Sequence, residues 1–186
     1  MADVDESRLQ FARSNGYATA IYAVNPNRGA TIQEKLSIAK DTAERISSAT
    51  WDNSEAVGRL DATFECTGVE SCIQAAVYAT KPGGAVILVG LGVPNHIIPV
   101  SEMMKNEISL IPNWRYAHTY PRAIEIATAS VTGAAANGTK LPDIRKLITH
   151  RFYGISSVEA GMKIAQRTKD GNDEVVIKVV IDSEIP

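Results

Sequence analysis

Cysteine, histidine and long apolar runs are all scarce in this sequence of 186 residues, which has two cysteines and three histidines. Cys66 and Cys72 are too few for a disulfide framework and lack the spacing of zinc ligands. We expect them to be reduced thiols of a cytoplasmic protein, because disulfides are rare inside cells. No stretch of about 18 apolar residues is present to span a bilayer. The acidic, polar N-terminus is not typical of a signal peptide.

Clustered positive charge is also missing, because the net charge is -2 and no long basic run appears. Nucleic acids and anionic membranes bind clustered Lys and Arg, so we expect neither as a partner. The histidines, His96, His118 and His150, are not spaced as a metal site, and no HExxH motif is present. We therefore predict no metal ligand in this chain.

Strand-like and helix-like segments alternate along the chain. Thr31 with Glu34, and Ser156 with Glu159, have the spacing of helix-capping boxes. A helix is expected over Asp5–Asn15 and another from Thr119. The strand-like segments are Ala18–Val24, Ala62–Cys66, Ala85–Gly90, Glu107–Ile111, Ile148–Phe152 and Val175–Ile181. This alternation predicts an α/β fold with a mostly parallel sheet, whose ligands bind beyond the C-terminal ends of the strands.

Six segments in order carry a resemblance to one enzyme family. They are residues 3–9 (DVDESRL), 64–70 (FECTGVE), 78–84 (YATKPGG), 88–92 (LVGLG), 115–122 (RYAHTYPR) and 148–152 (ITHRF). Together they cover essentially the whole chain. The sequence resembles sorbitol and xylitol dehydrogenases of the zinc-containing medium-chain dehydrogenase/reductase superfamily.

The resemblance implies a truncated doubly wound (Rossmann) parallel sheet plus the C-terminal segment of a GroES-like domain. Residues 1–116 would be an incomplete NAD-binding domain, whose first strand and Gly-rich loop would precede Met1. Residues 117–186 would be helices and strands that return to the catalytic GroES-like domain. The family's zinc ligands also lie upstream, so zinc is expected in the full-length enzyme and not on this chain.

The implied reaction is oxidation of a sugar alcohol (sorbitol, xylitol or arabinitol) to a ketose with NAD. Two other interpretations stay open. In the first, the chain is an inactive remnant that binds nucleotide weakly or associates with a full-length homologue. In the second, it is one segment of a split gene. A zinc-free quinone-reductase-like enzyme is disfavoured, because such enzymes usually prefer NADPH and lack the Arg115-Tyr116 pair.

Asp3 and Arg8 match the family's residues for the adenosine end of NAD. The Asp3 carboxylate would accept hydrogen bonds from the ribose hydroxyls and repel a 2′-phosphate, which favours NAD over NADP. Without the resemblance, the sequence favours a helix N-cap for Asp3 and a solvated helix cation for Arg8. Asp5 competes with Asp3 for this role, but the match places Asp5 inside the following turn.

Three short segments match cofactor contacts at strand ends: Cys66, Thr67 and Gly68; Val89, Gly90 and Leu91; and Asn113 with Trp114 and Arg115. Glycine lets backbone approach a ligand, and a helix N-terminus offers free N–H groups. Cys66 is otherwise a small buried apolar residue, and no His is placed beside it to make it a nucleophile. Asn113 and Trp114 depart from the family's small apolar residue and Phe.

Arg115 and Tyr116 match substrate contacts, since their donors and acceptors suit the hydroxyls of a sugar alcohol. The alternative is a domain-interface arginine paired with a carboxylate. Because the central first strand of the Rossmann sheet would be missing, we also expect Ala18–Val24 to pair with Ala62–Cys66. The resemblance further implies a homo-oligomer formed through the Rossmann sheet.

Overall fold

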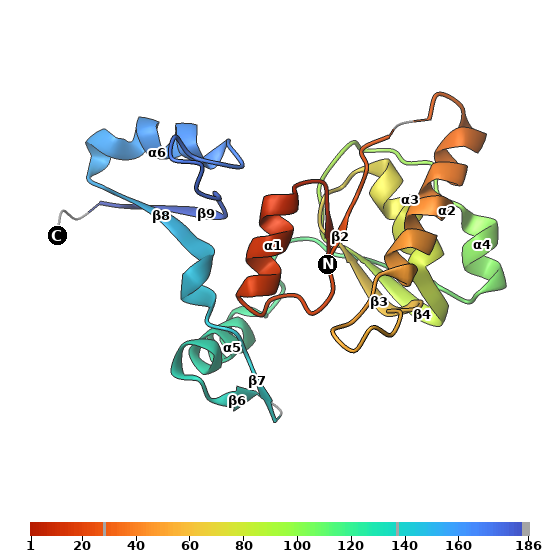
Figure 1. Cartoon of the computed structure of the whole chain (residues 1–186), viewed down its shortest axis with the longest axis horizontal. Coiled ribbons are helices and arrows are strands. Elements are labelled where there is room, and N and C mark those ends of the chain that lie inside the picture. Colours follow the sequence, from red (N-terminus) through yellow and green to blue (C-terminus); the bar gives the residue numbers. More distant parts are fainter. Residues whose placement is uncertain (28, 137, 184–186) are drawn as a thin grey trace. The chain divides into compact units, whose positions relative to one another are not determined.

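The computed structural model describes residues 1–27, 29–136 and 138–183, which form an α/β fold with parallel strands (Figure 1). The longer helices are α1 (Glu6–Ser14), α2 (Ile32–Ser48), α3 (Glu70–Ala79), α4 (Val100–Lys105), α5 (Tyr120–Thr132) and α6 (Val158–Ala165). The short 3-10 helices are η1 (Ile144–Leu147) and η2 (Ile155–Ser157). The strands are β1 (Ala2–Asp3), β2 (Tyr22–Ala23), β3 (Leu60–Glu65), β4 (Thr80–Leu88), β5 (Ser109–Pro112), β6 (Ala135–Ala136), β7 (Thr139–Lys140), β8 (Ile148–Tyr153) and β9 (Lys178–Asp182).

The chain divides into two compact units. The first joins Met1–Val4 with Ala20–Ala117, and the second joins Asp5–Thr19 with His118–Pro186. Helix α1 therefore makes its contacts within the second unit, whereas β1 belongs to the first. The domain assignment made from the sequence stays a prediction. Among the described residues, no helix is long and apolar enough to cross a membrane.

A parallel three-stranded sheet, in the order β3-β4-β5, forms the centre of the first unit. Helices α2 and α3 pack against each other, and α3 contacts β3 and β4 (Figure 1). The apolar core of this unit consists of Ala76, Val77, Val86 and Ile108, with Leu88, Ile98, Met103 and Leu110 packed against it. Burial of Val86 on a central parallel strand is the expected outcome for a sheet covered by helices.

The second unit contains the parallel pair β8–β9, with α6 packed on these two strands (Figure 1). Gly161 of α6 faces β9, where an added Cβ atom would come within 2.9 Å of the Ile181 side chain. A small residue is thus needed for α6 to approach the strand closely. The hairpin β6–β7 is antiparallel and follows α5.

The predicted pairing of Ala18–Val24 with Ala62–Cys66 is wrong. Strand β2 instead pairs in parallel with β1, with Ala2 opposite Tyr22 and Asp3 opposite Ala23. Two backbone hydrogen bonds, Tyr22 N to Met1 O at 2.9 Å and Val24 N to Asp3 O at 2.8 Å, fix this pairing. The short N-terminal strand β1 thus supplies backbone hydrogen-bond partners for β2. Strand β3 is therefore an edge strand of its sheet within the described residues.

The structure contains one of the two predicted capping boxes. Thr31 and Glu34 form the predicted capping box at the start of α2. Ser156 does not cap α6, because it lies in η2, and Ser157 is the residue that precedes α6. Asp5 is the N-cap of α1 and accepts a hydrogen bond from Arg8 N at 3.1 Å.

Candidate functional site

The three strands of the central sheet end side by side. Because β3, β4 and β5 are parallel neighbours and Leu88 is in register with both Glu65 and Pro112, their C-terminal ends lie at one edge. The predicted cofactor segments 66–68, 89–91 and 113–115 follow these ends directly. Backbone hydrogen bonds continue past them, from Val89 N to Glu65 O at 2.8 Å and from Asn113 N to Leu88 O at 3.1 Å. The structure thus gathers three of the predicted segments at the edge where α/β sheets bind ligands.

Glycines bring two of these segments into backbone contact. A Cβ atom on Gly90 would lie 2.1 Å from Gly68 N, and one on Gly92 would lie 1.8 Å from Gly68 O. Gly68 also has a φ of +70°, a backbone conformation that residues with a Cβ atom rarely adopt. Only glycine fits at these three positions. Gly92 was not predicted as a site residue, although it ends the segment 88–92 (LVGLG) that carried part of the resemblance.

Glu65 is a residue of this edge that the sequence reasoning missed. Its side chain is buried, and its carboxylate accepts hydrogen bonds from Thr67 N at 2.8 Å and Gly68 N at 2.9 Å, as well as from the Thr67 hydroxyl. The expected free N–H groups of Thr67 and Gly68 are therefore occupied. This corner does not offer them to an anion. A lone acidic residue within a strand-like segment was the available signal, since buried carboxylates require partners.

Cys66 has an exposed position at the same corner, and its thiol lies 3.7 Å from Phe64 O. Partial burial of the sulfur atom and, secondarily, the charge of Glu65 raise the pKa of the Cys66 thiol. Both effects disfavour the thiolate, which is the nucleophilic form. Cys66 is therefore not activated as a nucleophile at this corner.

The segment after β5 presents two large aromatic rings and a guanidinium group. The side chains of Trp114 and Tyr116 are 66% and 70% exposed. The Arg115 guanidinium carbon lies 5.2 Å from the centre of the Trp114 ring, within the range of a cation–π contact. Arg115 also has a φ of +55°, a conformation that costs energy for a residue with a Cβ.

Asp3 and Arg8 lie in different units. Asp3 is half-buried at the end of β1, opposite Ala23. Arg8 lies in α1, where one terminal nitrogen donates to Val176 O at 3.4 Å. The Arg8 Nε atom is buried and has no hydrogen-bond partner among the described residues. The adenosine roles of Asp3 and Arg8 stay predictions.

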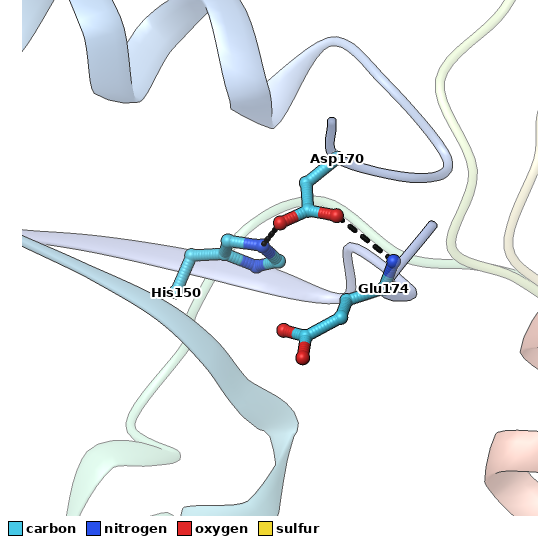
Figure 2. Close-up of side chains that lie close together, drawn as sticks. All are labelled: His150, Asp170 and Glu174. Atoms are coloured by element: carbon cyan, nitrogen blue, oxygen red, sulfur yellow. Dashed lines mark hydrogen bonds and ion pairs between the residues drawn. The ribbon is translucent and has the colours of Figure 1, made fainter. Parts of the chain in front are cut away.

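A second polar group, His150, Asp170 and Glu174, lies in the second unit, and its potential ligand atoms are all within 4.8 Å of one another. Figure 2 shows the imidazole directed at the Asp170 carboxylate, with His150 Nε2 3.4 Å from Asp170 Oδ2. The other oxygen of Asp170 accepts from Asn172 N at 2.9 Å and Glu174 N at 2.8 Å. The Glu174 N–H bond is the main cause that lowers the pKa of Asp170.

These contacts have a structural explanation without a metal ion. His150 lies on β8, and Asp170 begins the turn that leads toward β9. The contact between His150 and Asp170 therefore places this turn beside β8, and the other Asp170 oxygen is already held by two backbone N–H groups. Sequence spacing could not reveal the group, because its members are 20 and 4 residues apart. The absence of a metal ligand from this chain stays a prediction.

Comparison with solved structures defines the class of fold. The zinc-dependent alcohol dehydrogenase 2 from Streptococcus pneumonia matches with a TM-score of 0.68, 18% identity, and coverage of 100% of this chain and 44% of that chain. The 2R,3R-butanediol dehydrogenase from Bacillus subtilis matches with a TM-score of 0.62 and 17% identity, covering 97% of this chain and 42% of that chain. The fold is that of the corresponding part of an alcohol dehydrogenase.

Sequence comparison gives the family. The model for "zinc-binding dehydrogenase" matches residues 1–129, so the chain belongs to this family. Gallus gallus sorbitol dehydrogenase is 31% identical over 172 residues, covering 92% of this chain and 39% of the relative. L-Arabinitol 4-dehydrogenase of Hypocrea jecorina is 31% identical over 183 residues, covering 98% and 41%. The chain thus spans about 40% of the length of these curated relatives.

Proposed function

We propose that this chain is part of an NAD-dependent dehydrogenase that oxidises a sugar alcohol to a ketose. The observation that carries the proposal is the edge where β3, β4 and β5 end, with Gly68, Gly90 and Gly92 in backbone contact. Membership of the zinc-binding dehydrogenase family supports it. So do relatives named for sorbitol and L-arabinitol.

The residues at this edge fit the nicotinamide end of a dinucleotide. The Cβ positions of Gly68 and Gly90 are filled by backbone of the neighbouring segment, so these glycines let the ends of β3 and β4 pack closely and place their exposed neighbours beside one another. The neighbouring side chains of Val89 and Leu91 are exposed and apolar. Glu65 withdraws the N–H groups of Thr67 and Gly68 from anions, so the pyrophosphate belongs elsewhere. We assign Asp3, which ends β1 in the first unit, to the adenosine end.

Arg115 and Tyr116 are proposed to bind the substrate hydroxyls. Both are exposed and follow β5 directly. In this reaction class a zinc ion, held by residues outside those assigned in this chain, would polarise the hydroxyl oxygen, and NAD⁺ would accept the hydride from the carbon that bears it. The contribution of this chain is to orient the two reactants, with Arg115 held over the Trp114 ring.

We also propose that the 186 residues alone do not turn over polyols. The zinc ligands and the Gly-rich loop that the resemblance implies are not assigned to any of these residues. An absorbance assay for NADH with sorbitol, xylitol and L-arabinitol, with added Zn²⁺, tests this. A turnover of about 1 per second or more, the usual enzyme range, would contradict it.

A chimaera tests the polyol activity itself. In it, this chain replaces the matching segment of Gallus gallus sorbitol dehydrogenase, which is 31% identical over 172 residues. We expect NAD-dependent polyol oxidation by the chimaera, and a loss of kcat/KM of about tenfold or more in its Arg115→Ala variant, because a charged hydrogen bond contributes about 1.5–3 kcal/mol. Zinc content and circular dichroism establish that the chimaera is folded. A folded, zinc-loaded chimaera without activity would refute the proposal.

A further inference from the structure

The connection between β4 and α4 is fastened to α3 at two separate places. The first is the contact of Gly90 and Gly92 with Gly68, just before α3 begins. The second is at Ile97, whose N–H donates to Glu70 Oε2 at 2.8 Å and whose carbonyl accepts from Gln74 Nε2 at 2.7 Å. Both backbone polar groups of Ile97 are thus hydrogen-bonded to side chains of α3.

Glu70 and Gln74 are well placed to act together, because residues four apart share one face of a helix. Gln74 is fully buried among the apolar residues of α3. Burying an amide is costly unless it is hydrogen-bonded, and its bond to Ile97 O supplies that partner. The other end of the amide, Oε1, has no partner among the described residues. A leucine would fill this buried position without the cost of burying an amide. We therefore infer that the amide of Gln74 is there to hold the loop through Ile97.

Glu70 has a second contact that supports its role. Lys35 of α2 lies 3.1 Å from Glu70 Oε1. The Ile97 N–H bond and then Lys35 hold the pKa of Glu70 below its ordinary value, so the group stays an ionised acceptor at neutral pH. Helices α2 and α3 and the loop are joined at this carboxylate.

We propose that Glu70 and Gln74 are positioning residues for the loop that carries Val89, Gly90 and Leu91. The proposal rests on the proposed function, in which this loop contacts the nicotinamide end of NAD. Leu91 and Val93 are 73% and 60% exposed, so the middle of the loop has little apolar packing to hold it. Ile98 packs against the core and keeps the α4 end in place. The two side chains on α3 set the path between these points.

Amide hydrogen exchange followed by NMR on the full chain tests the positioning. In Glu70→Ala, exchange at Ile97 should rise about tenfold, the effect of losing one hydrogen bond, and exchange should also rise at Val89 and Gly90, whose N–H groups bond to Glu65 O. Glu70→Gln keeps an acceptor and should restore protection. Lys35→Met is the matched control, because it removes the ion pair and leaves both bonds to Ile97. A general role in stability would instead speed exchange equally at Val86 in the core, and that result would overturn the proposal.

Titration of the same samples with NAD separates this proposal from the proposed function. We expect the dissociation constant of Glu70→Ala to be about three- to tenfold weaker than wild type, with Glu70→Gln and Lys35→Met close to wild type. If wild type shows no NAD-dependent shifts, the proposed function fails for this chain, and exchange at Val89 and Gly90 still decides whether the loop is positioned. Unchanged exchange there in Glu70→Ala, or unchanged NAD affinity despite faster exchange, would overturn the inference.

Discussion

At the scale of single residues, Glu65 has the clearest structural role. It is 4% exposed, and its carboxylate binds the backbone of the two residues after Cys66. Its own carbonyl accepts from Val89 N and Gly90 N. One residue therefore ties the end of β3 to the end of β4. A buried carboxylate is tolerated here because donors surround it.

We predict that Glu65→Gln destabilises the fold by about 1–3 kcal/mol, because the new amide would turn a donor toward the N–H of Gly68 or Thr67. Urea unfolding measures the change. Glu159→Gln is the control: its carboxylate pairs with Lys163 on the surface of α6, and exposed pairs of this kind contribute less than about 0.5 kcal/mol. Equal effects of the two substitutions would show that Glu65 does not organise the corner.

Asp3 allows a prediction about cofactor choice. If its carboxylate binds the ribose hydroxyls, NAD should bind more tightly than NADP. Asp3→Ala should bring the ratio of the NAD and NADP dissociation constants closer to one, because it removes both the hydrogen-bond acceptor and the repulsion of a 2′-phosphate. NMR titration of wild type and variant with each nucleotide gives the two ratios. An unchanged ratio would refute the assignment of Asp3.

At the scale of secondary-structure elements, Asp143 shows how one side chain starts a short helix. It is the N-cap of η1, and its carboxylate accepts from Arg145 N at 3.0 Å and from the Arg145 guanidinium. Its carbonyl accepts from the Tyr17 hydroxyl at 2.5 Å, which links the segment after α1 to η1. The guanidinium of Arg145, followed by its backbone N–H, lowers the pKa of Asp143 from 3.8 to about 2.

This lowered pKa gives a pH dependence with a definite sign. The stabilisation by Asp143 is present above its unfolded pKa and is lost as the pH falls from about 4 to about 2. Asp143→Asn should therefore lower the Tm of the second unit at pH 7, and its Tm should converge with that of wild type toward pH 2. Thermal unfolding across this range measures it. A difference that stays constant with pH would contradict the role of the charge.

Elements with a long periodic pattern could be predicted from the sequence, and short ones could not. The apolar face of α2 and its capping box identified that helix. The apolar run in β4 likewise identified a central strand. Helix α4 has six residues, too few for a periodic pattern. Strand β2 has only two paired residues. Its pairing partner therefore depends on which strand the tertiary fold brings beside it, and the local sequence does not show this.

The candidate site divides in the same way. Cys66–Gly68, Val89–Leu91 and Asn113–Arg115 could be predicted to meet, because the ends of neighbouring parallel strands share one edge. Glu65, Gln74 and Ile97 could not, because their roles depend on hydrogen bonds between segments that only the fold brings together. The proximity of the three residues in Figure 2 could not be predicted from the sequence for the same reason.

At the scale of the whole molecule, the unpaired edge of β3 is the main liability. Within the described residues no strand pairs with this edge, and Phe64 on the strand is 68% exposed. Open strand edges pair readily with other chains. We predict concentration-dependent self-association of the purified chain, reduced in Phe64→Lys. Light scattering over a range of concentrations tests this. A monomer at all concentrations would contradict it.

The most direct test of the central claim is a map of NAD binding on the chain. In ¹H–¹⁵N spectra recorded with increasing NAD, the account predicts shifts at Gly68, Val89–Leu91 and Asn113–Tyr116, with affinity weaker than micromolar, because Glu65 occupies the N–H groups of the Gly68 corner. The amides of β8 and β9 should not shift. Saturable shifts confined to β8, β9 and α6, or no shifts at several millimolar NAD, would contradict the assignment of the nucleotide site to the edge of the β3–β4–β5 sheet.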